Sequence, residues 1–306
     1  MKLRGHETFY IRKGWLTKGM KYVSQFPDVF TSKAPARKPM DVLGIGSNMV
    51  LSLRYWLQTV GLTKEDKGEK GKRIQKLTSF GELVFNNDKY IEEIGTLYLL
   101  HYRLASNKEN ATSWYYFFNR LNLSEFTEED FFIGLSKFLA DNDYGKEISK
   151  RLVDDDFSCI ISTYISKEKS SGSEVSAENN IDCPLGELNL LDIVSKRKGI
   201  VTYKKSVPSP KSFDPYVILA AINEKRNAEE DKGLEIQLNK LMTDDNSIGK
   251  IFNLDAVSLL DVLHAVEKTG KLKIIRTAGL DVIRLTHDYS FEDCVRMYYE
   301  HLNEIR

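Results

Sequence analysis

The chain has 306 residues, and its 44 lysines and arginines balance 44 aspartates and glutamates, so the formal net charge is zero. A hydrophobic content of 42% excludes a wholly disordered chain, and no apolar run reaches the roughly 18 residues that a membrane helix needs. Three scattered cysteines exclude a disulfide framework and a paired-cysteine zinc site, so we expect a globular, cytoplasmic protein.

The neutral total hides an uneven distribution of charge. Residues 1–80 contain 16 basic and 6 acidic residues, so the rest of the chain carries the compensating negative charge. A basic amino-terminal region is typical of proteins that bind a polyanion, of which nucleic acid is the commonest. The alternative is a solvated basic face that binds nothing.

The first region, residues 1–88, is predicted to contain a helix-turn-helix. Gly44-Ile45-Gly46 follows a short helix, Ser47 is a suitable N-cap, and residues 48–60 contain no glycine or proline. Apolar residues form one stripe of this second helix. The opposite face carries polar side chains, namely Asn48, Ser52, Tyr55, Gln58 and Thr59, with Arg54 at its edge and Leu51 out of place.

The residues that follow predict the rest of a winged helix. Gly61 ends the second helix, residues 62–73 form a charged tip, residues 74–77 form a strand, and Thr78 caps a further helix. In this geometry the second helix enters the major groove of duplex DNA. The alternative is a winged helix that contacts only proteins.

The predicted DNA contacts fall into two groups. Asn and Gln on the second helix can recognise adenine and Arg can recognise guanine, whereas lysines and arginines around the motif lie near phosphates. The first group is Ser47, Asn48, Ser52, Arg54, Tyr55 and Gln58, and the second is Lys33, Arg37, Lys38, Lys70, Lys72 and Arg73.

The middle region, residues 89–165, is predicted to be helical. Its helices are expected at 90–104, 114–121, 131–139 and 147–164, the third of them capped by Thr127. Residues 166–180 are polar and rich in Ser and Glu, which predicts a linker or mobile loop.

The last region, residues 181–306, is predicted to be a second winged-helix-like module. A helix is expected to start at Pro184, and further helices are expected at 215–226, 234–243, 255–268 and 291–302, with a hairpin of 271–277 and 280–286. The charge of this module is nearly balanced, which favours a structural or protein-binding role over nucleic-acid binding. The predicted fold class is mainly α within an α+β protein.

The segment 5–19 concentrates reactive side chains. It holds His6, Glu7, Arg12 and Lys18 together with three glycines. A His–Glu pair with two cations can form a phosphate site with a general acid or base, and these four are the candidate catalytic residues. The alternative, which we favour, is an internal network that pairs Glu7 with Arg12 and His6 with the backbone.

Other chemical motifs are weak or missing. The sequence contains no GxxxxGK[ST], HExxH or GxSxG string. Pro27-Asp28 with Glu65-Asp66-Lys67 matches a nuclease string only loosely, and three consecutive aspartates at 154–156 diverge around a helix, which favours a solvated face. Cys183, at a helix start, could have a lowered thiol pKa, but a buried structural thiol is the better interpretation.

Five segments together resemble the landmarks of one protein family. They are GHETFYIRKGWLTKG (5–19), LGIGSNMVLSLRYW (43–56), IDCPLGELNLL (181–191), FDPYVILAAI (213–222) and RTAGLDVIRL (276–285). This uncharacterised-domain family is encoded beside PAPS-reductase-like genes and includes the SspB-like proteins of bacterial DNA phosphorothioation. The resemblance covers nearly the whole chain.

The resemblance implies a role in a system that replaces a phosphate oxygen of DNA by sulfur and couples this mark to phage defence. Its implied partners are double-stranded DNA, a cysteine desulfurase, an ATPase and a PAPS-reductase-like enzyme. It also implies strand nicking with Mg²⁺ or Mn²⁺, carried onto His6, Glu7, Arg12 and Lys18, and DNA contacts at Asn48 and Arg54. The alternatives are a non-catalytic DNA-binding regulator of the same machinery and a scaffold that binds only proteins.

Overall fold

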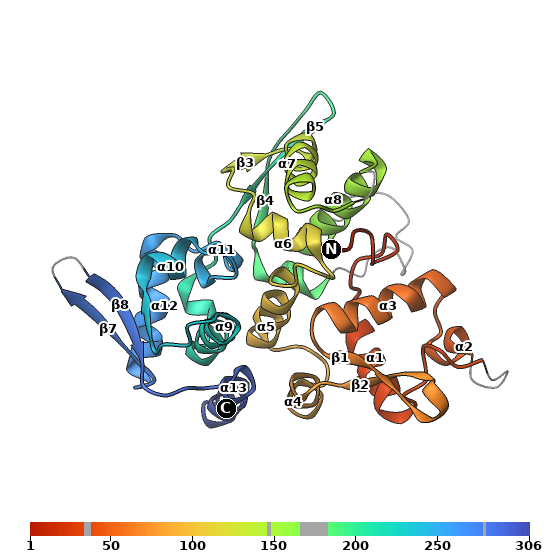
Figure 1. The fold of residues 1–306 in the computed structure, drawn as a ribbon, viewed down its shortest axis with the longest axis horizontal. Helices are drawn as coiled ribbons and strands as arrows, with labels where there is room; N and C mark the ends of the chain where they lie inside the picture. The colour runs from red at the N-terminus through yellow and green to blue at the C-terminus, as the bar shows by residue number, and fades with distance from the viewer. Residues whose placement is uncertain (34–37, 146–147, 166–182, 278–279) are drawn as a thin grey trace.

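The computed structural model describes residues 1–33, 38–145, 148–165, 183–277 and 280–306, without the side chains of Lys70, Thr277 and Leu280. The predicted linker 166–180 and the predicted phosphate contact Arg37 lie outside these residues. Within them, helices form the centre of the molecule and three small antiparallel sheets lie towards its edges, so the expected mixture of helix and sheet is confirmed (Figure 1).

The amino-terminal part consists of helices followed by a two-stranded hairpin. Its elements are α1 (Trp15–Gln25), α2 (Pro39–Leu43), α3 (Ser47–Thr59), β1 (Thr63–Lys67), the 3-10 turn η2 (Glu69–Gly71), β2 (Arg73–Leu77) and α4 (Ser79–Asn87). Gly44, with a φ of 60°, lets the chain leave α2 in the left-handed conformation. Ser47 is the first residue of α3 rather than its cap, because Gly46 holds the N-cap position.

The middle part is helical, as predicted. It contains α5 (Ile94–Ala105), α6 (Thr112–Asn119), the short strand β3 (Glu125–Phe126), α7 (Glu128–Asp141) and α8 (Lys150–Tyr164). Helix α7 begins with a capping box in which Thr127 and Asp130 each bond the other's backbone N–H. The acidic first turn of α7 also suits the positive end of the helix dipole.

The carboxy-terminal part combines two sheets with five helices in the described residues. Its elements are η4 (Pro184–Leu188), β4 (Leu191–Arg197), β5 (Ile200–Lys205), η5 (Pro210–Ser212), α9 (Pro215–Ala228), β6 (Glu235–Gln237), α10 (Leu238–Thr243), α11 (Ile248–Ile251), α12 (Ala256–Lys268), β7 (Leu272–Thr277), β8 (Leu280–Leu285) and α13 (Phe291–Glu304). The strands are ordered β3-β5-β4 in one sheet and β6-β8-β7 in the other.

Two sequence predictions are wrong in this part of the chain, and one hairpin was not predicted. The expected helix 234–243 begins with strand β6, which pairs with β8 so that Ile236 lies opposite Ile283. The expected helix at Pro184 is a single 3-10 turn. The β4–β5 hairpin is absent from the elements predicted above.

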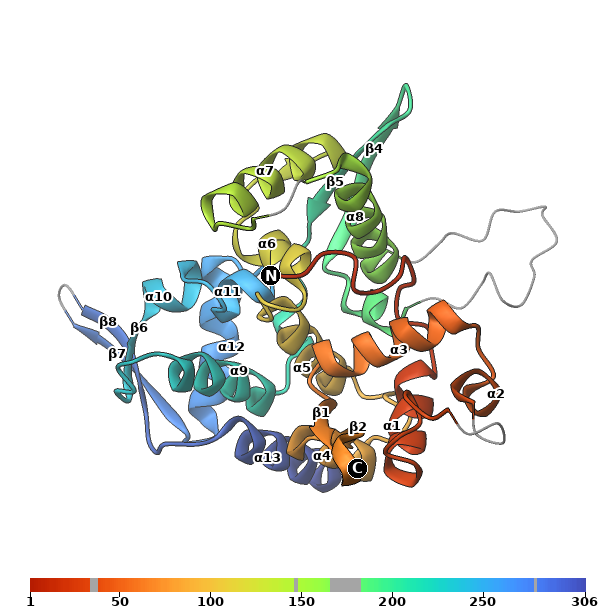
Figure 2. The same ribbon diagram turned by 45° about the vertical axis from the view of Figure 1, so that its right-hand side comes forward.

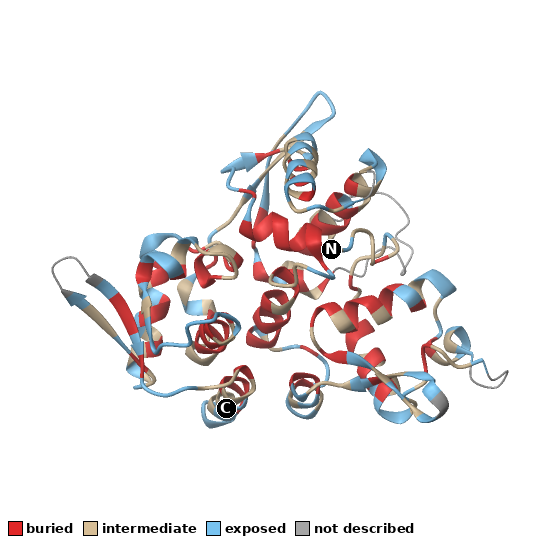
Figure 3. Cartoon of the chain, in the orientation of Figure 1, coloured by how far each residue is buried: buried red, intermediate tan, exposed pale blue. Residues whose placement is uncertain are grey.

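One hydrophobic core joins the parts of the chain. The buried hydrophobic side chains form one cluster, whose members range in sequence from Ile11 to Tyr299. Helices α5 and α6 lie at its centre and are buried almost throughout (Figure 3). Both ribbon views place α4 beside α13, where the Phe80 and Phe291 rings meet edge to face with centroids 5.3 Å apart (Figures 1 and 2). The first and last parts of the chain therefore stabilise each other.

Candidate nucleic-acid interface

The exposed surface of α3 is a narrow stripe along one side of the helix. Ser47 and Asn48 are exposed at its start, and Leu51 follows with 50% of its surface exposed. Arg54 and Gln58 continue the stripe as half-buried side chains. The spacing of three to four residues places these side chains in one row, so α3 can present the row to a ligand.

The structure corrects the predicted polar face of α3 at three positions, one of which is Thr59, a buried residue whose hydroxyl donates to the backbone oxygen of Tyr55. Ser52 is fully buried and its hydroxyl donates to the backbone oxygen of Phe9 (3.3 Å). Tyr55 is buried against Gly5, and its hydroxyl donates to the backbone oxygen of Asn110 (2.9 Å). Neither Ser52 nor Tyr55 can reach a duplex, because the amino-terminal segment covers this side of the helix.

Ion pairs join α3 to the β1–β2 hairpin. The Arg54 guanidinium pairs with Glu65 on β1, and Arg73 on β2 approaches the same carboxylate at 3.7 Å. Lys76 pairs with Asp66 across the hairpin (2.8 Å), and hydrogen bonds from Lys76 and Lys67 hold the pKa of Asp66 below its ordinary value. The acidic residues of the hairpin are thus largely compensated by their own basic neighbours.

Several lysines near this hairpin have no such compensation. Lys64, Lys67 and Lys72 are exposed and form no ion pair within the described residues. Lys33 and Lys38, before α2, are also exposed. Residues 63–77 contain six basic and three acidic residues, so the hairpin carries an excess of positive charge. This surface, together with the exposed row of α3, is the candidate interface.

His6 is a core residue rather than an exposed acid or base. It is fully buried, and its Nδ1 accepts the backbone N–H of Thr8 (3.1 Å), which places the proton on Nε2. Nε2 donates to Asp156 Oδ1 on α8 (2.7 Å). The buried Asp156 carboxylate also accepts from the backbone of Arg4 (2.8 Å) and from the hydroxyl of Ser113.

The other candidate catalytic residues have separate surroundings. Arg12 lies over the rings of Phe9 and Trp15, with centroid distances of 5.9 and 5.5 Å. The Lys18 ammonium donates to the backbone oxygen of Leu43, the last residue of α2 (3.1 Å). Glu7 is partly exposed and is not among the ion pairs of the described residues. His6 and Lys18 thus have buried or capping roles, and the proposed pair of Glu7 with Arg12 does not form.

The described carboxylates do not fit the divalent metal that nicking implies. Among these residues, no three His, Cys, Asp or Glu side chains lie together as a metal site requires. Asp155 pairs with Arg4 (2.9 Å), and both oxygens of Asp156 accept hydrogen bonds. In the loose nuclease string, Glu65 and Asp66 are paired with basic residues. We therefore derive no catalytic step from these groups.

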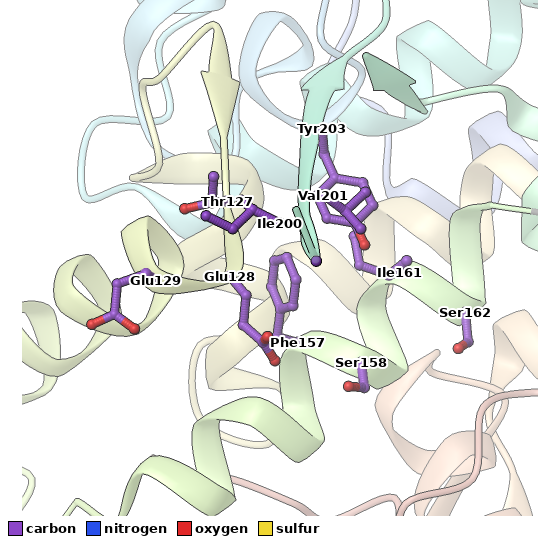
Figure 4. A pocket seen from close by; sticks show the side chains of 11 residues that line it. Thr127, Glu128, Glu129, Phe157, Ser158, Ile161, Ser162, Ile200, Val201 and Tyr203 are labelled. Carbon is purple, nitrogen blue, oxygen red and sulfur yellow. The ribbon is translucent and has the colours of Figure 1, made fainter. Parts of the chain in front are cut away.

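A cavity of about 460 Å³ opens between α7, α8 and β5 (Figure 4). Its walls include Phe157, Ile200 and Tyr203, and Glu128 and Glu129 stand at its edge. Burial, followed by the nearby charge of Asp154, raises the pKa of Glu128. The cavity thus combines apolar side chains and hydroxyl groups with an acidic edge, and this edge makes it unsuitable for phosphate.

The β4–β5 hairpin is a basic feature that the sequence prediction missed. It projects from the body of the molecule in both ribbon views, and Lys196, Arg197 and Lys198 are exposed near its turn (Figures 1 and 2). Lys198 and Gly199 have φ values of 49° and 82°, as a tight two-residue turn requires. The β-branched residues on both sides of this Lys-Gly pair are the signal that could have revealed the hairpin.

The surroundings of the cysteines agree with the interpretation of Cys183 as a buried structural thiol. Cys183 is buried, as are Cys159 and Cys294, and none of the three forms a disulfide. Cys183 is thus placed as a core thiol. Over the described residues, no helix combines the length and apolar character needed to cross a bilayer.

Comparison with known proteins identifies relatives of this fold. No curated protein matches the chain. A solved structure described as magnesium ion-bound SspB is 24% identical with a TM-score of 0.82, covering 99% of this chain and 89% of that chain. A second SspB structure is 24% identical with a TM-score of 0.81, covering 99% of this chain and 87% of that one.

The resemblance stated from the sequence is therefore confirmed at the level of the fold. A family model described as a protein of unknown function, DUF4007, matches residues 3–299. Because this match spans almost the entire sequence, the chain belongs to the DUF4007 family.

Proposed function

We propose that this protein is a duplex-DNA-binding component of a bacterial DNA phosphorothioate modification system. In this proposal the elements α1, α2, α3, β1 and β2 act as a winged helix, in which α3 enters the major groove and the hairpin follows the phosphate backbone. The order of these elements and the SspB-like fold support the proposal.

The observation that carries the proposal is the common surface of α3 and the β1–β2 hairpin. Asn48 and Arg54 lie in the exposed row of α3, and the uncompensated Lys64, Lys67 and Lys72 lie on the adjacent hairpin. Lysines placed in this way neutralise phosphates, and an asparagine or arginine in the groove can bond base edges. Arg54 would exchange its partner Glu65 for DNA when the duplex binds.

The first test measures duplex affinity in variants of this surface. Arg54→Ala removes a candidate base contact, which is expected to weaken specific binding by about 1–3 kcal/mol. Lys72→Ala removes a phosphate contact and is expected to lower the slope of log affinity against log salt by about one. Fluorescence anisotropy of a labelled duplex at several salt concentrations measures both effects.

The matched control is Lys273→Ala, an exposed lysine on the β7–β8 hairpin of the carboxy-terminal part. It removes the same charge from a hairpin for which the sequence predicts no nucleic-acid binding. The affinity for duplex DNA and its dependence on salt should therefore stay unchanged. If Arg54→Ala and Lys72→Ala both fold and bind duplex like the parent protein, the proposed interface is incorrect.

A second candidate function is protein binding by the same surface. Leu51 on α3 and Met40 on α2 are exposed apolar side chains, 50% and 42% accessible, and apolar surface favours a protein partner over DNA. A protein-binding surface would lose affinity for its partner in Leu51→Asn and would show no salt-dependent duplex binding. The desulfurase, the ATPase and the PAPS-reductase-like enzyme are the partners to test.

Strand nicking is a separate part of the proposal. Although the described carboxylates do not form a metal site, a nicking activity would be detected as conversion of supercoiled plasmid to open circles in Mg²⁺ or Mn²⁺. Because Glu7 is partly exposed and outside the core network, loss of nicking in Glu7→Gln with unchanged duplex affinity would assign it a catalytic role. Plasmid that stays supercoiled with either metal, with affinity retained, would instead support the non-catalytic regulator.

A further inference from the structure

A second open cavity lies where the end of β5 meets α10 and α11. Its volume is about 490 Å³, within the range of small-molecule sites. Twelve residues line it: Phe118, Leu121, Asn122, Leu123, Ser124, Lys205, Met242, Thr243, Gly249, Lys250, Asn253 and Leu254. None of these is acidic, in contrast to the glutamates beside the cavity of Figure 4.

Lys205 lies in an apolar part of this cavity wall. Its ammonium donates to the backbone oxygen of Leu121 (2.7 Å) and stands over the rings of Phe117 and Phe118, at 5.3 and 5.9 Å from their centroids. Burial, and then the charge of Lys250, lowers the pKa of Lys205 to about 7. Within the described residues, no carboxylate pairs with Lys205, so a bound anion would favour its charged form.

Lys250 provides a second positive charge in the same cavity. It lies on α11, and its ammonium donates to the side-chain oxygen of Asn122. One hydrogen bond leaves two N–H groups of each ammonium for a ligand. Since Lys205 and Lys250 repel each other, an anion between them would be attracted by both.

The remaining wall of the cavity is suited to an apolar or planar group. Leu123 contributes exposed aliphatic surface and Met242 is half-buried, and the almost fully buried side chains of Phe118, Leu121 and Leu254 lie behind them. An inorganic ion would use only the two lysines, whereas a ligand with an apolar part would also bury this wall. The cavity therefore favours an anion joined to an apolar or planar group.

We propose that this cavity binds a nucleoside monophosphate, with the phosphate between the ammonium groups of Lys205 and Lys250 and the base against the apolar wall. The same chemistry is offered by a free nucleotide and by the 5′-phosphorylated end of a DNA strand. The cavity uses residues of α6, β5, α10, α11 and the loops beside them, so the proposal is independent of duplex binding by α3 and the β1–β2 hairpin.

Isothermal titration calorimetry of the full chain tests the proposal. Adenosine 5′-monophosphate should bind with a dissociation constant below about 1 mM, and adenosine and sulfate should each bind at least about tenfold more weakly. Lys205→Met and Lys250→Gln should each weaken binding of the monophosphate by about tenfold or more. Lys250→Gln keeps the test valid if Lys205→Met does not fold, because Lys250 is only partly buried.

Lys204→Gln is the matched control. Lys204 precedes Lys205 on β5 and is exposed, so its side chain points to the other face of the strand. This variant should bind the monophosphate like the parent protein. Undetectable binding by the parent, equal binding of sulfate and the monophosphate, or full binding by folded Lys250→Gln would each overturn the proposal.

Competition between the monophosphate and a 5′-phosphorylated trinucleotide shows whether the ligand is a free nucleotide or the end of a DNA strand. Tighter binding of the trinucleotide supports a strand end as the ligand, and tighter binding of the monophosphate supports a free nucleotide. Anisotropy measurements with the duplex should be unchanged in Lys250→Gln. Failure of this site and failure of the α3 interface therefore give different results.

Discussion

At the scale of single residues, His6 shows how a side chain typical of catalysis can instead stabilise the core. Its ring lies 6.0 Å from Trp56 in a stacked arrangement, and its two nitrogens are bonded to Asp156 and to the backbone of Thr8. The GHETFY string thus connects the beginning of the chain to α8. Of the internal network expected from the sequence, the contact of His6 with the backbone is present, but Glu7 does not pair with Arg12, and His6 bonds a carboxylate 150 residues away.

We predict that His6→Ala lowers the free energy of unfolding by about 2–4 kcal/mol. The change leaves the buried Asp156 carboxylate without one of its donors and creates a cavity beside Trp56. Urea unfolding followed by tryptophan fluorescence measures the loss. Glu7→Gln, at a partly exposed neighbour, should change stability by less than about 0.5 kcal/mol. An unchanged midpoint in His6→Ala would contradict a structural role.

At the scale of elements, α3 differs from the helix that its periodicity predicts. A helical wheel treats the polar side chains Ser52, Tyr55 and Thr59 as one free face, yet all three are buried. Their hydroxyls donate hydrogen bonds to backbone oxygens, so burying these polar groups costs little free energy. Periodicity identifies the face that packs on the neighbouring helices, but it cannot show that residues 5–9 cover a second face.

Helix α13 provides a prediction about pH. Ser290 and Asp293 form a capping box, and the hydrogen bonds from Ser290 hold the pKa of Asp293 below its ordinary value of 3.8. A lowered folded-state pKa contributes stability that is present above the ordinary pKa and is lost as the pH falls through the folded one.

Asp293→Asn should therefore destabilise the protein at pH 7 and reduce the part of the stability loss that occurs below about pH 4. Ser290→Ala should cost about 1 kcal/mol at neutral pH, because the helix loses its cap. Chemical unfolding between neutral and acidic pH measures both effects. A parallel pH dependence in Asp293→Asn and the parent protein would contradict this assignment.

At the scale of the whole molecule, the amino-terminal part shares its core with the rest of the chain. Trp56 on α3 meets Trp114 on α6 edge to face at 5.3 Å, and Asn107 donates to the backbone oxygen of Thr59 at the end of α3 (3.4 Å). The candidate DNA-binding surface is therefore supported from behind by the middle helices, which hold α3 and the hairpin in a fixed arrangement.

We predict that residues 1–88 do not fold alone. This fragment lacks Trp114, Asp156 and Phe291, which bury Trp56, His6 and Phe80 in the full chain. In urea, the fragment should show no cooperative change of tryptophan fluorescence, whereas the full chain should unfold cooperatively. A cooperative transition in the fragment would show that the amino-terminal part is an independent domain.

The local features of the fold could be predicted from the sequence. The cap at Thr127, the breaks at Gly44 and Gly61, and the hairpin that follows α12 are encoded by neighbouring residues, because caps and turns depend on the chain within a few positions. The excess of basic residues before position 80 is likewise a property of the sequence itself.

The site depended on tertiary structure. Which side of α3 stays exposed is decided by residues 5–9, Arg54 receives Glu65 from the next strand, and His6 finds its carboxylate on a distant helix. The cavity of Lys205 and Lys250 likewise joins elements far apart in the sequence. Burial and charge pairing are set by contacts between distant segments, and no local pattern specifies which segments will meet.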